Sequence, residues 1–273
     1  MRGETAQLIA LCLKLNSVAG AAAVGSSFAE HSSMKFCRVV TFTHLKRKLL
    51  RPNPARVTMA TGPDDWMKAI LSMGLKRCYL SCAVRPENKL LTECSDDWQT
   101  TAFAGGGNVW ALTTQFADGH DTSWIPVWSY IGGDAPWDVE YQGFNEVFPD
   151  ESSSVEAAAE QLKAALIDIR DFARDMDLHW AKTFEGALAR LAGEEGPSYL
   201  GDMSSAGALT PEAEQLMHAC QASWVFGGMG SWNDIYMVGD TYMMDCPRYA
   251  AVSAALFDAI NQSLVAATNS RFP

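Results

Sequence analysis

The chain of 273 residues is 48% hydrophobic and has a formal net charge of −11. This length and apolar content allow a substantial core in one or two domains. Residues 1–58 hold nine Lys/Arg and two acidic residues (+7), whereas residues 59–273 hold twelve Lys/Arg and thirty acidic residues (−18). The acidic body argues against nucleic-acid binding, which depends on contacts with phosphates, and it favours a basic or cationic partner.

The seven cysteines form no close pairs, since Cys78 and Cys82 are the nearest in sequence. This spacing argues against a disulfide framework and against a zinc ribbon, and it indicates free thiols in a reducing compartment. No run of residues approaches the ~18–20 apolar residues that a membrane span requires. We therefore expect a soluble cytoplasmic protein that has no cofactor, no bound metal and no membrane contact.

Residues 1–58 have little periodicity and contain the basic run 44–48, followed by Pro52 and Pro54. Three interpretations compete for this segment. The apolar stretch Leu8–Leu15 resembles part of a secretory signal, and the scarcity of acidic residues is typical of an organelle transit peptide. The simplest interpretation is a disordered or non-native extension, because the composition changes abruptly at Met59.

Residues 59–150 are expected to form a Trp-rich antiparallel sheet region. Asp64 or Asp65 caps a short predicted helix, 66–73, which Gly74 ends. The Asp118-Gly119 pair is a hairpin signal between two apolar stretches. The predicted strands are residues 76–84, 109–116 and 124–131, and residues 90–94 are expected to pair back onto the first of them.

Residues 151–273 change to helical periodicity and are expected to form four helices. Ser153 to Glu156 is a capping box at the start of the first helix, and Thr210-Pro211 opens the third. The predicted helices cover residues 153–176, 180–193, 210–227 and 247–269. The chain is therefore predicted to be α+β, with a small antiparallel sheet followed by a four-helix region.

The most distinctive segment is the glycine loop, residues 226–234, which reads Phe-Gly-Gly-Met-Gly-Ser-Trp-Asn-Asp. Its glycines, Gly227, Gly228 and Gly230, are predicted to be structural, with Gly227 in the left-handed conformation at a helix end. The four residues that follow, Ser231, Trp232, Asn233 and Asp234, are the candidate binding residues. The polar three can also fold back onto the free amides of the loop.

The glycine loop resembles a motif of small uncharacterised bacterial proteins that are catalogued as a domain of unknown function. Their pattern is a helix pair, then Gly-Gly-Met-Gly-Ser-aromatic-Asn-Asp, then a final helix. The resemblance covers about residues 153–268 and includes Trp180 in an equivalent helix. It implies a fold for this region, and it implies no activity.

Other residues that could carry chemistry lack the neighbours that catalysis needs. The turn Asp118 to Asp121 combines carboxylates with His120, but no further ligand spacing supports a metal site. His179 is a single histidine on an amphipathic helix, where packing is the more common role. Ser231 does not lie in the Gly-x-Ser-x-Gly nucleophile elbow of α/β-hydrolases.

The expected function is that of a non-enzymatic protein-interaction module, which binds a basic partner through its tryptophans or the glycine loop. An immunity-type inhibitor of a basic toxin fits this charge. The alternative is a hydrolase that uses Asp234 with His120 or His179 as acid–base groups. The oligomeric state cannot be inferred from the sequence.

Overall fold

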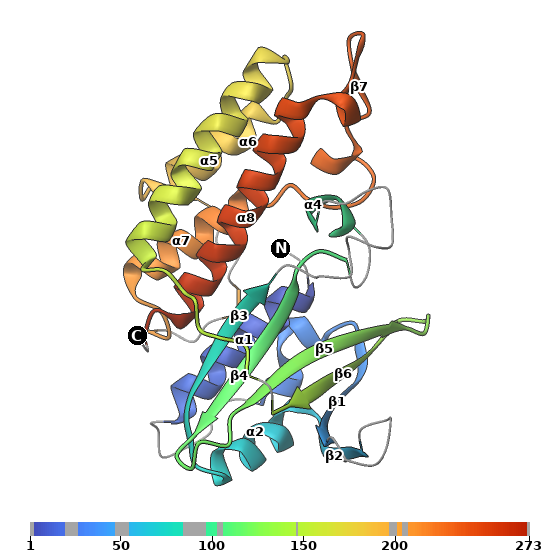
Figure 1. Cartoon of the computed structure of the whole chain (residues 1–273), viewed down its shortest axis with the longest axis vertical. Coiled ribbons are helices and arrows are strands. Elements are labelled where there is room, and N and C mark those ends of the chain that lie inside the picture. The colour runs from blue at the N-terminus through green and yellow to red at the C-terminus, as the bar shows by residue number, and fades with distance from the viewer. Residues whose placement is uncertain are drawn as a thin grey trace.

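The computed structural model describes residues 3–19, 27–46, 55–83, 97–102, 106–145, 147–196, 201–203 and 207–271. It has an α+β fold in which a six-stranded sheet is followed by C-terminal helices. The sheet with its two covering helices forms one end of the molecule, and the C-terminal helices form the other (Figure 1). The predicted fold class is thus confirmed at this level.

The sheet has the strand order β2-β1-β6-β5-β4-β3. Its strands are β1 (Cys37–Lys46), β2 (Ala55–Thr61), β3 (Leu75–Ala83), β4 (Val109–Phe116), β5 (Thr122–Tyr130) and β6 (Trp137–Phe144). Neighbouring strands are antiparallel except for β1 and β6, which run parallel, so the sheet is mixed and larger than predicted. The predicted strand 90–94 lies outside the described residues.

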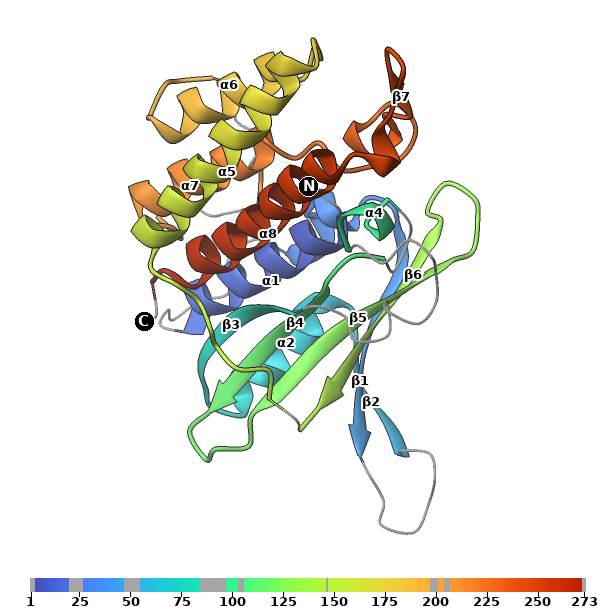
Figure 2. The same cartoon turned by 45° about the horizontal axis from the view of Figure 1, so that its top comes forward.

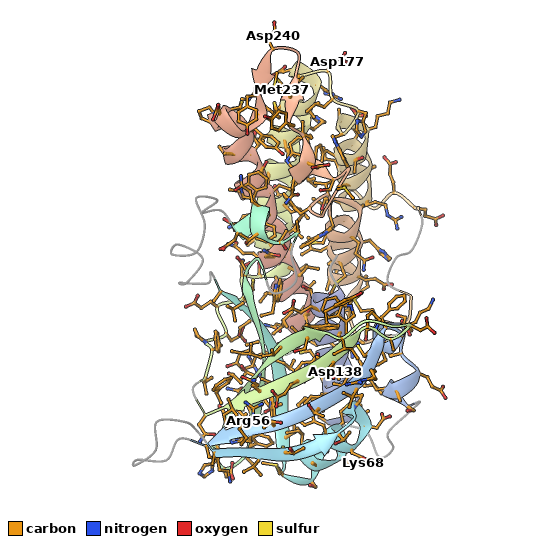
Figure 3. The ribbon with its side chains drawn as sticks, turned by 90° about the vertical axis from the view of Figure 1, so that its right-hand side faces the viewer. Arg56, Lys68, Asp138, Asp177, Met237 and Asp240 are labelled. Carbon is orange, nitrogen blue, oxygen red and sulfur yellow. The ribbon has the colours of Figure 1, made fainter. Side chains whose placement is uncertain are left out.

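Helices α1 (Gly3–Ala19) and α2 (Pro63–Ser72) cover one face of the sheet. The ring of Phe42 on β1 stacks on Trp66 of α2 at 4.2 Å and on Tyr141 of β6 at 4.8 Å. The Tyr141 hydroxyl donates to Gln7 Oε1 of α1 at 2.7 Å. The opposite face carries exposed ion pairs, including Asp138 with Arg38, so the sheet has one buried and one solvated face (Figure 3).

The expectation that residues 1–58 form a disordered or non-native extension is wrong for the described part of this segment. Leu8, Leu11 and Leu15 of α1 are fully buried, and β1 lies inside the sheet between β2 and β6. Figure 2 shows α1 between α8 and the sheet. A helix that is buried on nearly all sides has no polar face, and therefore its sequence shows no amphipathic stripe.

Strand β3 lies at the edge of the sheet, and two asparagines satisfy its outward-facing backbone. Asn16 of α1 accepts from the Cys78 N–H at 2.8 Å and donates to the Cys78 carbonyl at 2.7 Å. Asn269 of α8 does the same for Leu80, at 2.8 Å and 2.9 Å. Each side-chain amide thus replaces one residue of a neighbouring strand, which protects the edge and ties both helices to the sheet.

The C-terminal helices are α5 (Val155–Asp175), α6 (Ala181–Leu191), α7 (Pro211–Ala222) and α8 (Pro247–Asn269). Shorter elements are α4 (Asp97–Thr100), β7 (Met237–Val238), β8 (Thr241–Tyr242) and four 3₁₀ turns at Phe28–Glu30, Ser32–Met34, Trp232–Asp234 and Met243–Asp245. The predicted bounds of α8 and the predicted cap of α7 at Thr210 are confirmed.

Two predicted caps are wrong by one to three residues. Ser154, rather than Ser153, caps α5, since its hydroxyl accepts from the Ala157 N–H at 3.2 Å. Gly62 precedes α2, and Asp64 instead accepts from the Phe28 N–H at 2.8 Å. The side chain that was expected to cap its own helix therefore holds the segment that follows α1.

Helix α8 corrects the expectation that no segment is apolar enough to cross a membrane, because its length and composition pass that test. Within its most apolar window, however, 67% of the helix is buried inside the protein. Core helices of soluble proteins share these properties, so the helix gives only weak support for a membrane span.

Candidate functional site

The glycine loop begins four residues after the end of α7, at Ala222, and is held in place by Trp232. This side chain is fully buried and packs edge-on against Phe172 at 6.2 Å and Phe184 at 5.4 Å. Its indole N–H donates to Ser253 Oγ at 2.7 Å, and its backbone carbonyl accepts from the Tyr249 hydroxyl. The predicted binding residue Trp232 therefore belongs to the helical core.

The polar side chains of Asn233 and Asp234 bind the backbone of the protein itself. Asn233 Oδ1 accepts from the Gly227 N–H at 3.3 Å, and its Nδ2 donates to the carbonyl of Trp98 in α4 at 2.7 Å. Asp234 Oδ2 accepts from the Gly230 N–H at 2.8 Å. These hydrogen bonds close the loop and connect it to α4, which favours a structural role.

The glycine that needs the left-handed conformation is Gly230, with φ +78°, and not Gly227 as predicted. Helix α7 ends earlier than predicted, at Ala222, and Ser223 caps it by donating its N–H to the Ala219 carbonyl at 3.0 Å. Gly227 consequently lies in the loop, where its N–H is bound by Asn233. The helix end was misplaced because the apolar stripe continues through Trp224.

The remaining loop residues differ in exposure. Ser231 Oγ is buried and has no hydrogen-bond partner, whereas the Met229 side chain is 98% exposed at the loop tip. The nearby β7–β8 hairpin carries Met237 and Asp240, and Figure 3 shows both, like Asp177, at the end of the helical region that is far from the sheet. The loop thus offers solvent its methionine, its glycine backbone and the Asp234 side chain.

The histidines of the hydrolase alternative do not meet Asp234 in the described part of the chain. His120 lies on the exposed β4–β5 hairpin and pairs with Asp118 at 3.2 Å. This hairpin and the glycine loop lie at opposite ends of the molecule (Figure 1). His179 is exposed and packs on its neighbour Trp180 at 4.8 Å, so no acid–base pair is formed.

The buried thiols are poor nucleophiles. Burial raises the pKa of Cys82 to about 12, although a hydrogen bond from Asn108 opposes this shift. Burial also raises the pKa of Cys220 to about 12. A thiol with such a pKa is almost entirely protonated at neutral pH, and the thiolate is the reactive form.

The tryptophans of the sheet region divide into core and surface residues. Trp98, Trp110 and Trp124 are at most 4% exposed. Trp128 and Trp137 are only half-buried, and their rings meet edge-on at 5.9 Å. The predicted role of tryptophans at an interface can therefore apply only to this last pair among the five.

Trp128 and Trp137 line a surface cavity of about 490 Å³, which we term the aromatic groove. Phe36, 55% exposed, also lines it, and Tyr130, 71% exposed, packs on Trp137 at 5.4 Å. The other walls come from the start of α1, the Ser32–Met34 turn, residues 201–203 and α7. The groove lies on the same face of the sheet as α1, at the end of this face that α1 does not cover.

Sequence reasoning missed Phe36 and Tyr130. Phe36 lies in the segment that was interpreted as an extension, and its exposure depends on contacts far away in sequence. The alternation of Trp128 and Tyr130 was a usable signal, because residues two apart on a strand share one face.

Comparison of the chain with protein-family models, with curated proteins and with solved structures finds no match. The resemblance to the domain of unknown function therefore stays a prediction that rests on the nine residues of the glycine loop.

Proposed function

We propose that this protein is a non-enzymatic protein-interaction module, which binds a basic protein partner through the aromatic groove. The observation that supports this most directly is a surface cavity lined by Phe36, Trp128 and Trp137, with the exposed Tyr130 packed on Trp137. Aromatic residues are enriched at protein interfaces, and tryptophan and tyrosine supply many of the residues that dominate binding energy.

The charge of the chain supports the choice of partner. The whole chain has a formal net charge of −11, and the described residues that line the groove include no lysine or arginine. An apolar side chain flanked by lysine or arginine would fill the groove and be attracted by the net negative charge of the protein. This attraction would weaken as ionic strength rises, because salt screens exposed charges.

Site-specific photo-crosslinking tests the proposal. A photo-reactive phenylalanine replaces Tyr130 in one variant and Val127 in a control variant, and both are exposed to lysate of the source organism. Val127 is 42% exposed on the same strand, but its side chain is on the opposite face. We expect a basic protein to be crosslinked at Tyr130 and not at Val127.

The purified partner then allows a quantitative test. Tyr130→Ala should weaken its affinity about 30-fold, which corresponds to a loss of about 2 kcal/mol for an interface residue of this kind. Val127→Ala should leave the affinity unchanged. Equal crosslinking at both positions, or an affinity that Tyr130→Ala does not alter, would exclude the aromatic groove as the binding surface.

A further inference from the structure

A second cavity, which we term the α8 cleft, lies between the sheet and α8. It has a volume of about 340 Å³, which falls in the range of about 300–1,000 Å³ typical of small-molecule sites. The end of β3, Asn108 before β4, the segment Phe148–Ser153 and one side of α8 line it. It shares no lining residue with the aromatic groove.

Two buried amides that line the α8 cleft have unused hydrogen-bonding capacity. Asn261 of α8 is 2% exposed, and neither its Oδ1 nor its Nδ2 has a partner. Asn108 is 8% exposed, and its Oδ1 also lacks a partner, while its Nδ2 donates to Cys82 Sγ at 3.3 Å. Buried polar side chains are normally paired, so each exception needs an explanation.

The contrast with Asn269 shows that the structure does use asparagine amides fully elsewhere. Asn269 lies eight residues after Asn261 on the same helix and makes three hydrogen bonds, two with Leu80 and one with Asp150. Packing of α8 therefore does not prevent an asparagine from finding partners. Asn261, with its unpaired amide, instead lies in the wall of the α8 cleft.

The charges around the α8 cleft select a cationic ligand. Its lining includes the carboxyl groups of Asp258 and Glu151, and the described lining residues include no lysine or arginine. Burial and the nearby Asp97 raise the pKa of Asp258, and a bound cation would act in the opposite direction by favouring the ionised carboxylate. The free acceptors, Oδ1 of Asn108 and of Asn261, match a ligand that presents several N–H groups.

We propose that the α8 cleft binds a small molecule through its primary ammonium group. The ammonium donates to Oδ1 of Asn261 and of Asn108, and Asp258 supplies the counter-charge. Cys82 contributes no nucleophile, because its thiol stays protonated, so the cleft binds its ligand without covalent chemistry. An ammonium with three donors can satisfy these acceptors together, whereas an alcohol has one donor and no charge.

Isothermal titration calorimetry of the full chain tests the ligand class with matched probes. The amines are 1,4-diaminobutane and phenethylamine, and the controls are the alcohols 1,4-butanediol and phenethyl alcohol. We expect at least one amine to bind more than about tenfold tighter than its matched alcohol. Equal affinities for amine and alcohol, or no amine binding up to about 10 mM, would overturn the proposal.

Two variants locate the site. Asn261→Leu should lower the amine affinity at least about tenfold and leave the melting temperature unchanged or higher, because it removes an unpaired buried amide. Asp258→Asn should also weaken amine binding, whereas Asp245→Asn, the same change at an exposed residue outside the cleft, should not. A lower melting temperature with unchanged amine affinity in Asn261→Leu would make Asn261 a packing residue and refute the assignment.

Discussion

The replacement Asn269→Leu tests whether side-chain amides hold the edge of the sheet. Asn269 hydrogen-bonds to both the N–H and the carbonyl of Leu80. Leu80 is fully buried and lies on β3, the edge strand of the sheet. Leucine has a similar size but offers no hydrogen bond. The change therefore leaves two buried backbone groups without partners.

The expected loss follows from these two groups. A buried donor or acceptor that loses its partner costs about 1–3 kcal/mol, so the pair costs about 2–6 kcal/mol. Burial of the leucine side chain offsets up to about 2 kcal/mol. We expect the free energy of unfolding to fall by about 2–4 kcal/mol, which is a large share of the roughly 5–15 kcal/mol typical of folded proteins.

Urea unfolding followed by circular dichroism and tryptophan fluorescence measures this loss. With a slope of about 2–3 kcal/mol per molar urea, the midpoint should fall by roughly 1 M. Asn261→Leu is the matched control, since the same replacement on the same helix removes no hydrogen bond and should not lower the midpoint. Equal midpoints for the two variants would refute the role given to Asn269.

Three further predictions concern the glycine loop and the carboxylate of Asp150. Gly230→Ala should lower the free energy of unfolding by about 1–2 kcal/mol, because φ is positive there, whereas Gly228→Ala should leave the urea midpoint nearly unchanged. Trp232→Ala should cost about 3–5 kcal/mol in the same assay, since it empties a fully buried site. Burial alone would raise the pKa of Asp150. Hydrogen bonds from a neighbouring serine and the interaction with Arg77 outweigh burial, so the pKa is lowered. The ionised Asp150 carboxylate stabilises the folded state fully at neutral pH. This stabilisation is lost as the pH falls from about 4, the ordinary pKa of an aspartate, through the lowered pKa of Asp150. Asp150→Asn should therefore show a shallower loss of stability than the wild type when unfolding is measured between neutral pH and about pH 2; an unchanged slope would contradict this.

The C-terminal helices could be predicted because their signals are local. Thr210 and Pro211 mark the start of α7, and Pro247 with the apolar period up to Asn269 marks α8. In each case a cap or a first-turn proline lies next to the stripe that it begins. The Asp118-Gly119 hairpin is a local signal as well, and Gly119 has φ +79° as such a turn requires.

The N-terminal part could not be predicted, because its structure depends on distant partners. Strand β1 pairs with β6 about a hundred residues away, for example Val40 with Val139. Helix α1 is apolar on most of its surface, and its polar residues Gln7 and Asn16 hydrogen-bond with buried groups of the sheet. Neither feature leaves a periodic pattern in the sequence of its own segment.

The candidate sites were still harder to predict, because identical residue types have different roles. Asn16 and Asn269 complete the edge of β3, whereas Asn261 keeps its amide unpaired in the wall of a cleft. Nothing in the sequence separates them, since each is an asparagine in a mainly apolar helix. A stability measurement does, because natural proteins often retain a locally unfavourable residue where function requires it. Leucine at Asn269 should destabilise the protein and leucine at Asn261 should not, and the difference between those results separates an amide that the fold needs from one that a ligand needs.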